Sequence, residues 1–243
     1  LITGPDGQVW MNDWSDTGEC HDNDGIHRSS GRIYRIVYDG PDKGEPTTTR
    51  PWWLTQRAKG PLTLAETKAL LASEDETNRA MAIRWLAEDA PESPETLPLM
   101  LTLAGTDTSG LVRLELAAAL QRLPIDSCFP LASFLCNKDQ DAPDRQQSLM
   151  IWYGLSDLVN EHHIKSVSLA VTSKLPTVTR LITRRLAEDV EKTPGPVNDL
   201  LSRATPENRL PILRGLNEAL KGWSKAPKPA GLRISVVGGG CSG

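Results

Sequence analysis

Apolar residues between Leu62 and Trp223 recur at helical spacing. The clearest stripe lies in residues 112 to 123, where apolar side chains stand at i, i+4, i+7, i+8 and i+11. This spacing places them on one face of a helix and leaves the polar residues on the other. The stripe consists of Val112, Leu116, Ala119, Leu120 and Leu123. We therefore expect a helix here whose apolar face is buried.

Short motifs predict where several helices begin. Two capping boxes and two Ser/Thr-Pro steps occur: Thr63-x-x-Glu66, Ser73-x-x-Glu76, Ser93-Pro94 and Thr205-Pro206. In a capping box, side-chain oxygens accept from N–H groups that the first helical turn leaves unpaired. A Ser or Thr before Pro places a capping residue ahead of a proline at the first helical position. Each motif therefore predicts a helix start.

The predicted helices repeat along the chain. The strongest begin near residues 74, 109, 144, 176 and 206, so successive starts are 35, 35, 32 and 30 residues apart. A period of this length is typical of a helical solenoid, in which each two-helix unit buries its apolar face on the next. ETNRAMAIRWLAE and SGLVRLELAAALQRL resemble the second helices of HEAT repeats.

Residues 1 to 40 carry strand patterns instead. Pro5-Asp6-Gly7 indicates a turn, because Asp and Gly tolerate the backbone angles of a tight hairpin. GQVWMNDW follows, and RIYRIVY at residues 32 to 38 alternates with period two. Ile33, Arg35 and Val37 then share one face of the second strand. Two or three strands are marginal as a separate sheet, so we expect this segment to need neighbours from outside the chain.

These patterns predict a mainly α protein with a HEAT-like α-solenoid of about five helix pairs. The β segment occupies residues 1–40, a linker residues 41–61 and the helical repeats residues 62–223. The glycine-rich residues 224–243 are interpreted as a disordered or artefactual tail.

Charge and composition narrow the function classes. The 243 residues carry a formal net charge of −4 with interspersed signs, so no basic face for nucleic acid or anionic lipid is indicated. No apolar run reaches the ~18 residues of a membrane span, and the N-terminus lacks the pattern of a secretory signal. The cysteines, Cys20, Cys128, Cys136 and Cys241, form no C-x-x-C pair, so neither a zinc ribbon nor a disulfide framework is indicated.

The segment TGECHDNDGIHR at residues 17 to 28 is the candidate for metal chemistry. A c-type haem needs C-x-x-C-H, but Thr17 stands at the place of the first cysteine. Asp22-Asn23-Asp24-Gly25 opens like a calcium loop, but Ile33 stands where the closing Glu is required. A soft-metal site with carboxylate help remains open, and so does a polar loop between two strands. The candidate ligands are Cys20, His21, Asp22, Asp24 and His27.

The helical region offers weaker candidates. His162-His163 stands at a predicted helix junction, where we expect a solvated pair. Arg180, Arg184 and Arg185 crowd one helix, and Glu188 with Asp189 follows at ion-pair spacing. Cys128 and Cys136 would lie about 12 Å apart along one helix, which is too far for a disulfide. No catalytic triad, P-loop or dinucleotide fingerprint occurs. We therefore predict no catalytic and no cofactor-binding residue in this chain.

NDWSDTGECHDNDGIHRSSGRIYRIVY resembles the last propeller blade of bacterial membrane-bound dehydrogenase-like proteins, which are related to sorbosone and glucose dehydrogenases. The resemblance extends into LVRLELAAALQRLP, DAPDRQQSLMIWYGL and RLPILRGLNEALKGWSKAPKPAG. It implies a six-bladed quinoprotein β-propeller, then HEAT repeats, then a cytochrome c domain. Residues 1–40 would be the end of the last blade. The resemblance covers most of residues 8 to 231.

The residues that match the family motif have no catalytic role by this resemblance. They are Asp13, Trp14, Asp16, Gly18, Glu19, Gly25, Arg28, Gly31, Arg32, Ile33 and Tyr34, together with the five candidate ligands named above. The family's catalytic blades and its C-x-x-C-H motif are not in this chain. Pyrroloquinoline quinone and haem c are therefore implied for the parent protein, and no cofactor is expected in the chain itself.

The sequence supports two hypotheses about function. In the first, the chain is a non-catalytic C-terminal fragment of a quinoprotein sugar or alcohol dehydrogenase, and its helices are a spacer between the propeller and the cytochrome. This hypothesis implies a periplasmic or cell-envelope location. In the second, the chain is a free-standing HEAT-type protein-binding module with a β cap. A reading frame that extends into blades upstream and C-x-x-C-H downstream would distinguish the first from the second.

Overall fold

The computed structural model describes residues 2–3, 9–13, 32–36, 56 and 59–221. The chain divides at Pro61 into two compact units, and each is considered by itself. The predicted tail at 224–243 and most of the predicted linker lie outside the described residues.

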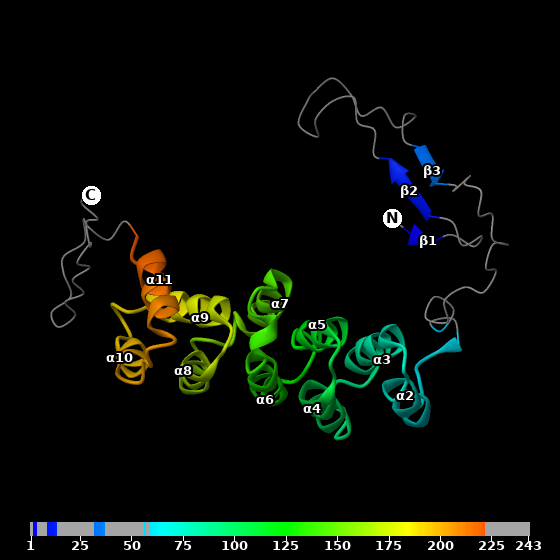
Figure 1. The fold of residues 1–243 in the computed structure, drawn as a ribbon, viewed down its shortest axis with the longest axis horizontal. Coiled ribbons are helices and arrows are strands. Elements are labelled where there is room, and N and C mark those ends of the chain that lie inside the picture. Colours follow the sequence, from blue (N-terminus) through cyan, green and yellow to red (C-terminus); the bar gives the residue numbers. More distant parts are fainter. Residues whose placement is uncertain (1, 4–8, 14–31, 37–55, 57–58, 222–243) are drawn as a thin grey trace. The chain divides into compact units, whose positions relative to one another are not determined.

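The first unit contains a small antiparallel sheet in the order β1-β2-β3. β1 spans Ile2–Thr3, β2 Val9–Asp13 and β3 Arg32–Ile36 (Figure 1). In the register of β2 and β3, Met11 stands opposite Tyr34. These strands confirm the small antiparallel β segment of the prediction. All of β3 is exposed, including Ile33 at 74%, so alternate side chains of this strand are uncovered on both faces.

The second unit is helical, and its elements follow one another with short connections (Figure 1). The helices are α2 (Leu64–Leu71), α3 (Glu76–Asp89), α4 (Thr96–Thr106), α5 (Gly110–Ala119), α6 (Ile125–Cys136), α7 (Arg145–Leu155), α8 (His163–Thr172), α9 (Pro176–Glu188), α10 (Gly195–Ser202) and α11 (Arg209–Ala219). A single turn of 3-10 helix, η1 (Asp139–Asp141), precedes α7. The chain is therefore mainly α, as predicted.

Alternate helices pack side by side in two layers. In one layer α3, α5, α7, α9 and α11 each contact the next, and in the other α4, α6, α8 and α10 do the same (Figure 1). The helices of the first layer begin at residues 76, 110, 145, 176 and 209, at intervals of 34, 35, 31 and 33 residues. These starts agree closely with the predicted ones. The arrangement is that of a solenoid-like stack of helical hairpins.

A repeated polar contact joins successive hairpins of the stack. The Arg79 guanidinium binds both oxygens of Asp107, with Nε–Oδ2 at 2.7 Å and Nη2–Oδ1 at 3.0 Å, and its Nη1 donates to the carbonyls of Ser73 and Glu74. One repeat later, Arg113 makes the same contacts with Asp141 and with the carbonyls of residues 107 and 108. Both the arginines and the aspartates are 34 residues apart. The hairpins therefore share hydrogen bonding as well as length.

A different polar contact stands at the corresponding position of α7. Gln147 lies 34 residues after Arg113 and donates from Nε2 to the carbonyl of Gly110 at 2.7 Å. This hydrogen bond runs back to the start of α5, whereas Arg79 and Arg113 each pair with an aspartate 28 residues later, so Gln147 does not repeat the bidentate contact.

The predicted apolar stripe is confirmed. Val112, Leu116, Ala119, Leu120 and Leu123 are all buried, with at most 8% of each residue exposed. They belong to a core that continues from Leu71 in α2 to Leu216 in α11. Because each hairpin buries its stripe against its neighbour, the helices form one connected core.

The first capping box is confirmed and the second is wrong. The Thr63 hydroxyl accepts from the Glu66 N–H, and the Glu66 carboxylate accepts from the Thr63 N–H. In α3, however, Asp75 is the cap and its carboxylate accepts from the Thr77 N–H at 2.8 Å. Ser73 accepts instead from the Asp75 N–H. Two oxygen-bearing side chains compete for this helix start, and the anionic one takes it.

The two predicted Ser/Thr-Pro starts are also displaced. α4 begins at Thr96 and α11 at Arg209, two and three residues after the prolines of these steps. Ser93 accepts from the Glu95 N–H and thus closes a local turn ahead of the helix. Ser and Thr form such turns as readily as caps, which explains why the motif located the region but not the first residue.

Two glycines allow neighbouring helices to approach closely. A Cβ on Gly154 of α7 would lie 2.3 Å from the Leu120 Cβ, and one on Gly215 of α11 would lie 2.4 Å from the Arg180 carbonyl oxygen of α9. Contacts of this kind leave no room for a methyl group. The spacing of α11 on α9 therefore depends on Gly215.

Both cysteines of the stack, Cys128 and Cys136, lie on α6 and are free and buried. This agrees with the expectation that they do not form a disulfide. Among the described residues, no helix is long and apolar enough to cross a membrane.

Candidate functional site

The candidate metal ligands and most of the motif residues lie outside the described part of the chain. These are Cys20, His21, Asp22, Asp24, His27, Trp14, Asp16, Gly18, Glu19, Gly25, Arg28 and Gly31. The metal site at residues 17 to 28 stays a prediction. Among the residues that the structure does describe, no group of three or more His, Cys, Asp or Glu side chains could hold a metal ion.

The remaining motif residues lie in the sheet. Asp13 of β2 stands opposite Arg32 of β3 in the antiparallel register. In the same register Ile33 stands opposite Asn12, and Tyr34 stands opposite Met11.

The His162-His163 pair is only half as predicted. His163 is exposed, but the His162 ring packs edge-on against Phe129 of α6 with centroids 6.0 Å apart. The Lys165 Nζ lies over the Phe129 ring, 5.7 Å from its centroid. The pair thus contributes one solvent-facing imidazole and one packing contact, because adjacent residues point in different directions at a helix start.

The arginine cluster on α9 forms the ion pairs of the prediction in part. Arg184 Nε lies 3.3 Å and Arg185 Nη1 3.0 Å from the two oxygens of Glu188. Asp189 does not take part, since it accepts from the amide of Asn160 at 2.8 Å. The third arginine of the cluster pairs across to Glu218 of α11. The Glu188 carboxylate therefore pairs with two guanidinium groups, those of Arg184 and Arg185.

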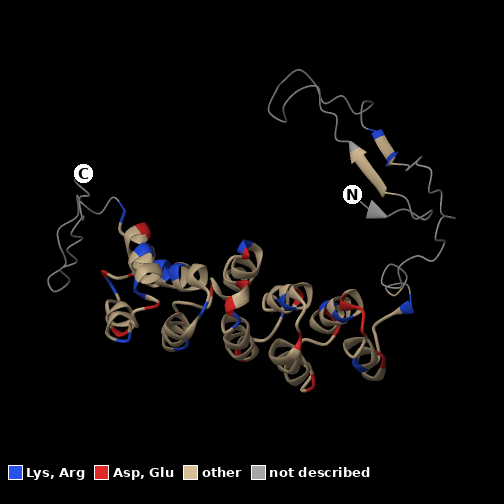
Figure 2. Ribbon diagram, viewed as in Figure 1, with Lys and Arg blue, Asp and Glu red and all other residues tan. Residues whose placement is uncertain are grey.

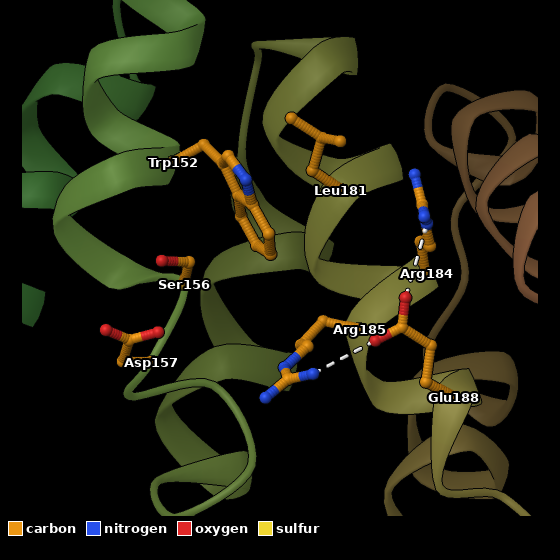
Figure 3. Close-up of a pocket in the computed structure, with 7 residues that line it drawn as sticks. All are labelled: Trp152, Ser156, Asp157, Leu181, Arg184, Arg185 and Glu188. Carbon is orange, nitrogen blue, oxygen red and sulfur yellow. Dashed lines mark hydrogen bonds and ion pairs between the residues drawn. The ribbon is translucent and has the colours of Figure 1, made fainter. Parts of the chain in front are cut away.

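These two arginines line a cleft between α7 and α9, which we call the Trp152 cleft. It has a volume of about 360 Å³ and is lined by Trp152, Ser156, Asp157, Leu181, Arg184, Arg185 and Glu188. In Figure 3 the Trp152 ring reaches from α7 toward α9, with Leu181 beside it and Arg185 below it. The cleft thus combines an apolar part with a charged rim.

Several polar groups of the cleft are unused within the described structure. Among the described residues, none accepts from the indole N–H of Trp152, none bonds the Ser156 hydroxyl and none forms an ion pair with Asp157. Arg184 is bonded through Nε alone. These donors and this acceptor have no partner among the described residues and are open to solvent, so a ligand could bond them.

A second cleft of about 420 Å³ lies between α3, α5 and α7, and we call it the Arg84 cleft. Arg84, Glu115, Ala118, Gln121, Arg122 and Met150 line it. Arg84 donates to both carboxylate oxygens of Glu115, and Arg122 lies 3.9 Å from Glu88. Because its charges are paired between helices, this cleft offers fewer free groups than the Trp152 cleft.

The buried cysteines are poor nucleophiles. Burial raises the pKa of the Cys136 thiol to about 12, although a hydrogen bond with Ser173 acts in the opposite direction. Burial also raises the pKa of the Cys128 thiol. Since the thiolate is the reactive form, neither side chain is prepared for covalent chemistry at neutral pH.

The pKa shifts at the repeated Arg–Asp contact fit a structural role. Burial of Asp107 opposes its ionisation, but the hydrogen bonds from Arg79 and from the Ser109 N–H outweigh this and lower the pKa of the carboxyl. The hydrogen bond to Asp141 raises the pKa of Arg113, against the lowering effect of burial. Both contacts hold neighbouring hairpins together.

The sequence contained part of the signal for the Trp152 cleft. The predicted helices near 144 and 176 are successive members of one layer, so their contact follows from the repeat. What the pattern does not give is the rotation of each helix, which turns Trp152 and Leu181 toward the gap between them. The pattern alone assigned α9's arginines to local ion pairs and overlooked Trp152.

Comparison of the chain with known protein families, with curated proteins and with solved structures found no match.

Proposed function

We propose that residues 62 to 221 form a non-catalytic scaffold that docks another protein domain on the α3, α5, α7, α9 and α11 layer. The observation that carries this proposal is the repeated bidentate contact of Arg79 with Asp107 and of Arg113 with Asp141. Bidentate pairs fix geometry as well as adding energy. Successive hairpins are thereby held in one relative orientation, and their outer helices present a fixed surface.

Side chains on this layer are suited to protein contact. Tyr153 of α7 is 55% exposed and Leu213 of α11 is 51% exposed. Aromatic residues and arginine are enriched at protein interfaces, and this layer also carries Trp152 and Arg184. A partner that covered these groups would remove apolar area from water.

The charge of the stack changes along its length, which would orient a partner. Residues 62 to 175 contain nine Lys or Arg and sixteen Asp or Glu, whereas residues 176 to 221 contain eight and six. Figure 2 shows basic residues on α9 and α11. The net charge thus passes from −7 to +2 along the stack. Unlike potentials at the two ends favour one docking direction over its reverse.

A photo-crosslinking experiment tests the proposal. A benzoylphenylalanine at position 153 of the full chain, in cells of the source organism, should give one reproducible protein adduct that mass spectrometry identifies. The matched control is the same side chain at position 164, because Ile164 is 71% exposed on α8 in the other layer. If position 153 gives no adduct beyond those of position 164, this layer does not dock a partner.

The narrower proposal is that the scaffold separates a quinone-containing dehydrogenase from a cytochrome in a cell-envelope protein. It is supported by the resemblance of residues 9 to 38 and of the helical segments to that family. Sequencing the gene on both sides tests it. Propeller blades upstream with C-x-x-C-H downstream are the expected result, and a start codon directly before Leu1 would exclude it in favour of a free-standing binding module.

A further inference from the structure

We infer that the Trp152 cleft binds an extended polypeptide segment that inserts one uncharged apolar side chain between Trp152 and Leu181. The inference rests on the proposed docking function and names the site and the chemistry of its occupant. It draws on the apolar surface, the unused hydrogen-bonding groups and the charge balance of the cleft.

The apolar surface gives the occupant an anchor. Trp152 and Leu181 come from adjacent helices and are both only partly buried, although each lines the cleft. A volume of about 360 Å³ lies at the lower end of the ~300–1,000 Å³ range of ligand pockets. It therefore suits one large side chain with its flanking backbone. Large aromatic side chains in such positions often dominate binding energy at interfaces.

The unused polar groups match a peptide backbone. The Trp152 indole N–H and the free N–H groups of Arg184 are donors, while Asp157 is an acceptor and the Ser156 hydroxyl is both. A polypeptide offers carbonyl acceptors and N–H donors in alternation along its length. A purely anionic ligand would satisfy the donors but would leave the Asp157 carboxylate facing a like charge.

The charge balance also favours an uncharged segment. Arg184 and Arg185 contribute two positive charges to the lining, and Glu188 and Asp157 contribute two negative charges. Arg180, one turn earlier on α9, is already paired with Glu218. The formal charges cancel, so the cleft has no strong electrostatic preference for a polyanion or a polycation.

The test is selection of random dodecapeptides displayed on phage against the full chain. The expected result is enrichment of peptides that share one large apolar residue with uncharged neighbours. A synthetic peptide from this set should shift the NMR signal of the Trp152 indole N–H, which is assigned by its absence in Trp152→Phe. Trp152→Ala should raise the peptide Kd at least about tenfold, or ~1.4 kcal/mol. Arg84→Ala, in the Arg84 cleft, is the matched control and should leave the Kd unchanged.

Trp152→Phe and Arg185→Ala keep the inference falsifiable where Trp152→Ala fails to fold. Trp152→Phe retains an aromatic ring but loses the donor, and we expect it to weaken binding by about threefold to tenfold, a loss of the size of one hydrogen bond. Arg185→Ala removes half of the cation charge and should shift selection toward basic peptides.

Several outcomes would overturn the inference. Peptides that bind without moving the Trp152 indole signal would show docking elsewhere, which leaves the scaffold proposal standing. Enrichment of acidic peptides, or loss of all binding at moderate salt, would indicate an anionic ligand. Failure to enrich any peptide while position 153 still gives its crosslinked adduct would exclude a linear segment as the occupant.

Discussion

The buried pair of Arg113 and Asp141 provides the sharpest test of how the stack is held together. Only 5% of the arginine side chain and 9% of the aspartate side chain are exposed, and both Nε–Oδ2 and Nη2–Oδ1 are 2.6 Å. Arg113→Met keeps much of the aliphatic stem and removes the guanidinium. The Asp141 carboxylate is then left buried without its counter-charge.

The expected loss follows from that isolated charge. Removal of one partner of a buried ion pair costs about 3–5 kcal/mol, because the other charge remains desolvated. Two backbone carbonyls, of Asp107 and Thr108, also lose their donor. With a denaturant dependence of about 2 kcal/mol/M, the urea midpoint falls by about 1.5–2.5 M. Far-UV circular dichroism at pH 7 measures this midpoint.

Two further variants test whether the loss of stability comes from a buried, isolated charge or from breaking any ion pair. Arg84→Met breaks the pair of Arg84 with Glu115, in which 45% of the arginine side chain is exposed, and should cost no more than about 1 kcal/mol. The double variant Arg113→Met/Asp141→Asn has no isolated charge and should recover at least half of the loss. If Arg113→Met is no more destabilising than Arg84→Met, the repeated contact does not stabilise the stack.

Three other predictions address close packing, thiol reactivity and pH. Gly215→Ala should lower the free energy of unfolding by about 1–3 kcal/mol in thermal melts, since a methyl group collides with the backbone of α9. Gly195→Ala, which meets nothing within 4 Å, should have no such effect. Iodoacetamide at pH 8 should leave Cys136 unlabelled in the folded chain and label it in urea, because burial raises its pKa to about 12; labelling of the folded chain would contradict its burial. The pKa of Asp107 is lower in the folded than in the unfolded chain, so its ionised carboxylate stabilises the fold at any pH above the unfolded value of about 3.9. This stabilisation is lost as the pH falls through the folded pKa. The urea midpoints of wild type and Asp107→Asn should therefore converge toward pH 3, and a constant gap from pH 7 to pH 3 would show that the pairing with Arg79 does not depend on this ionisation.

Much of the fold follows from local pattern, as particular elements show. The stripe of Val112 and Leu116 fixed both the helical state and the buried face of α5, because burial of an apolar face is a property of the helix itself. The stack of helical hairpins was predicted from the regular interval between helix starts, which local motifs mark. The strands at Val9–Asp13 and Arg32–Ile36 followed from period-two alternation.

The candidate site followed from the sequence far less. Helix starts at Ser73 and Ser93 were displaced because neighbouring oxygens compete for the same N–H groups, and the three-dimensional turn decides which one caps. Nothing in the sequence identified Arg79 and Arg113 as bidentate partners of the aspartates that lie 28 positions later. Their contact exists only because the next hairpin places its aspartate against them.

The sequence by itself determined the mainly helical class, the antiparallel β segment and the length of the repeat. Helix starts, apolar stripes and strand alternation are each set by residues that are close together in the chain. The tertiary structure decided which side chains meet. It turned Trp152 and Leu181 toward the gap between α7 and α9, paired Arg180 of α9 with Glu218 of α11, and buried Cys136 beyond reach of solvent. The physical reason is that helix rotation and packing depth are set jointly by all the side chains between neighbouring helices, and no single segment contains that information.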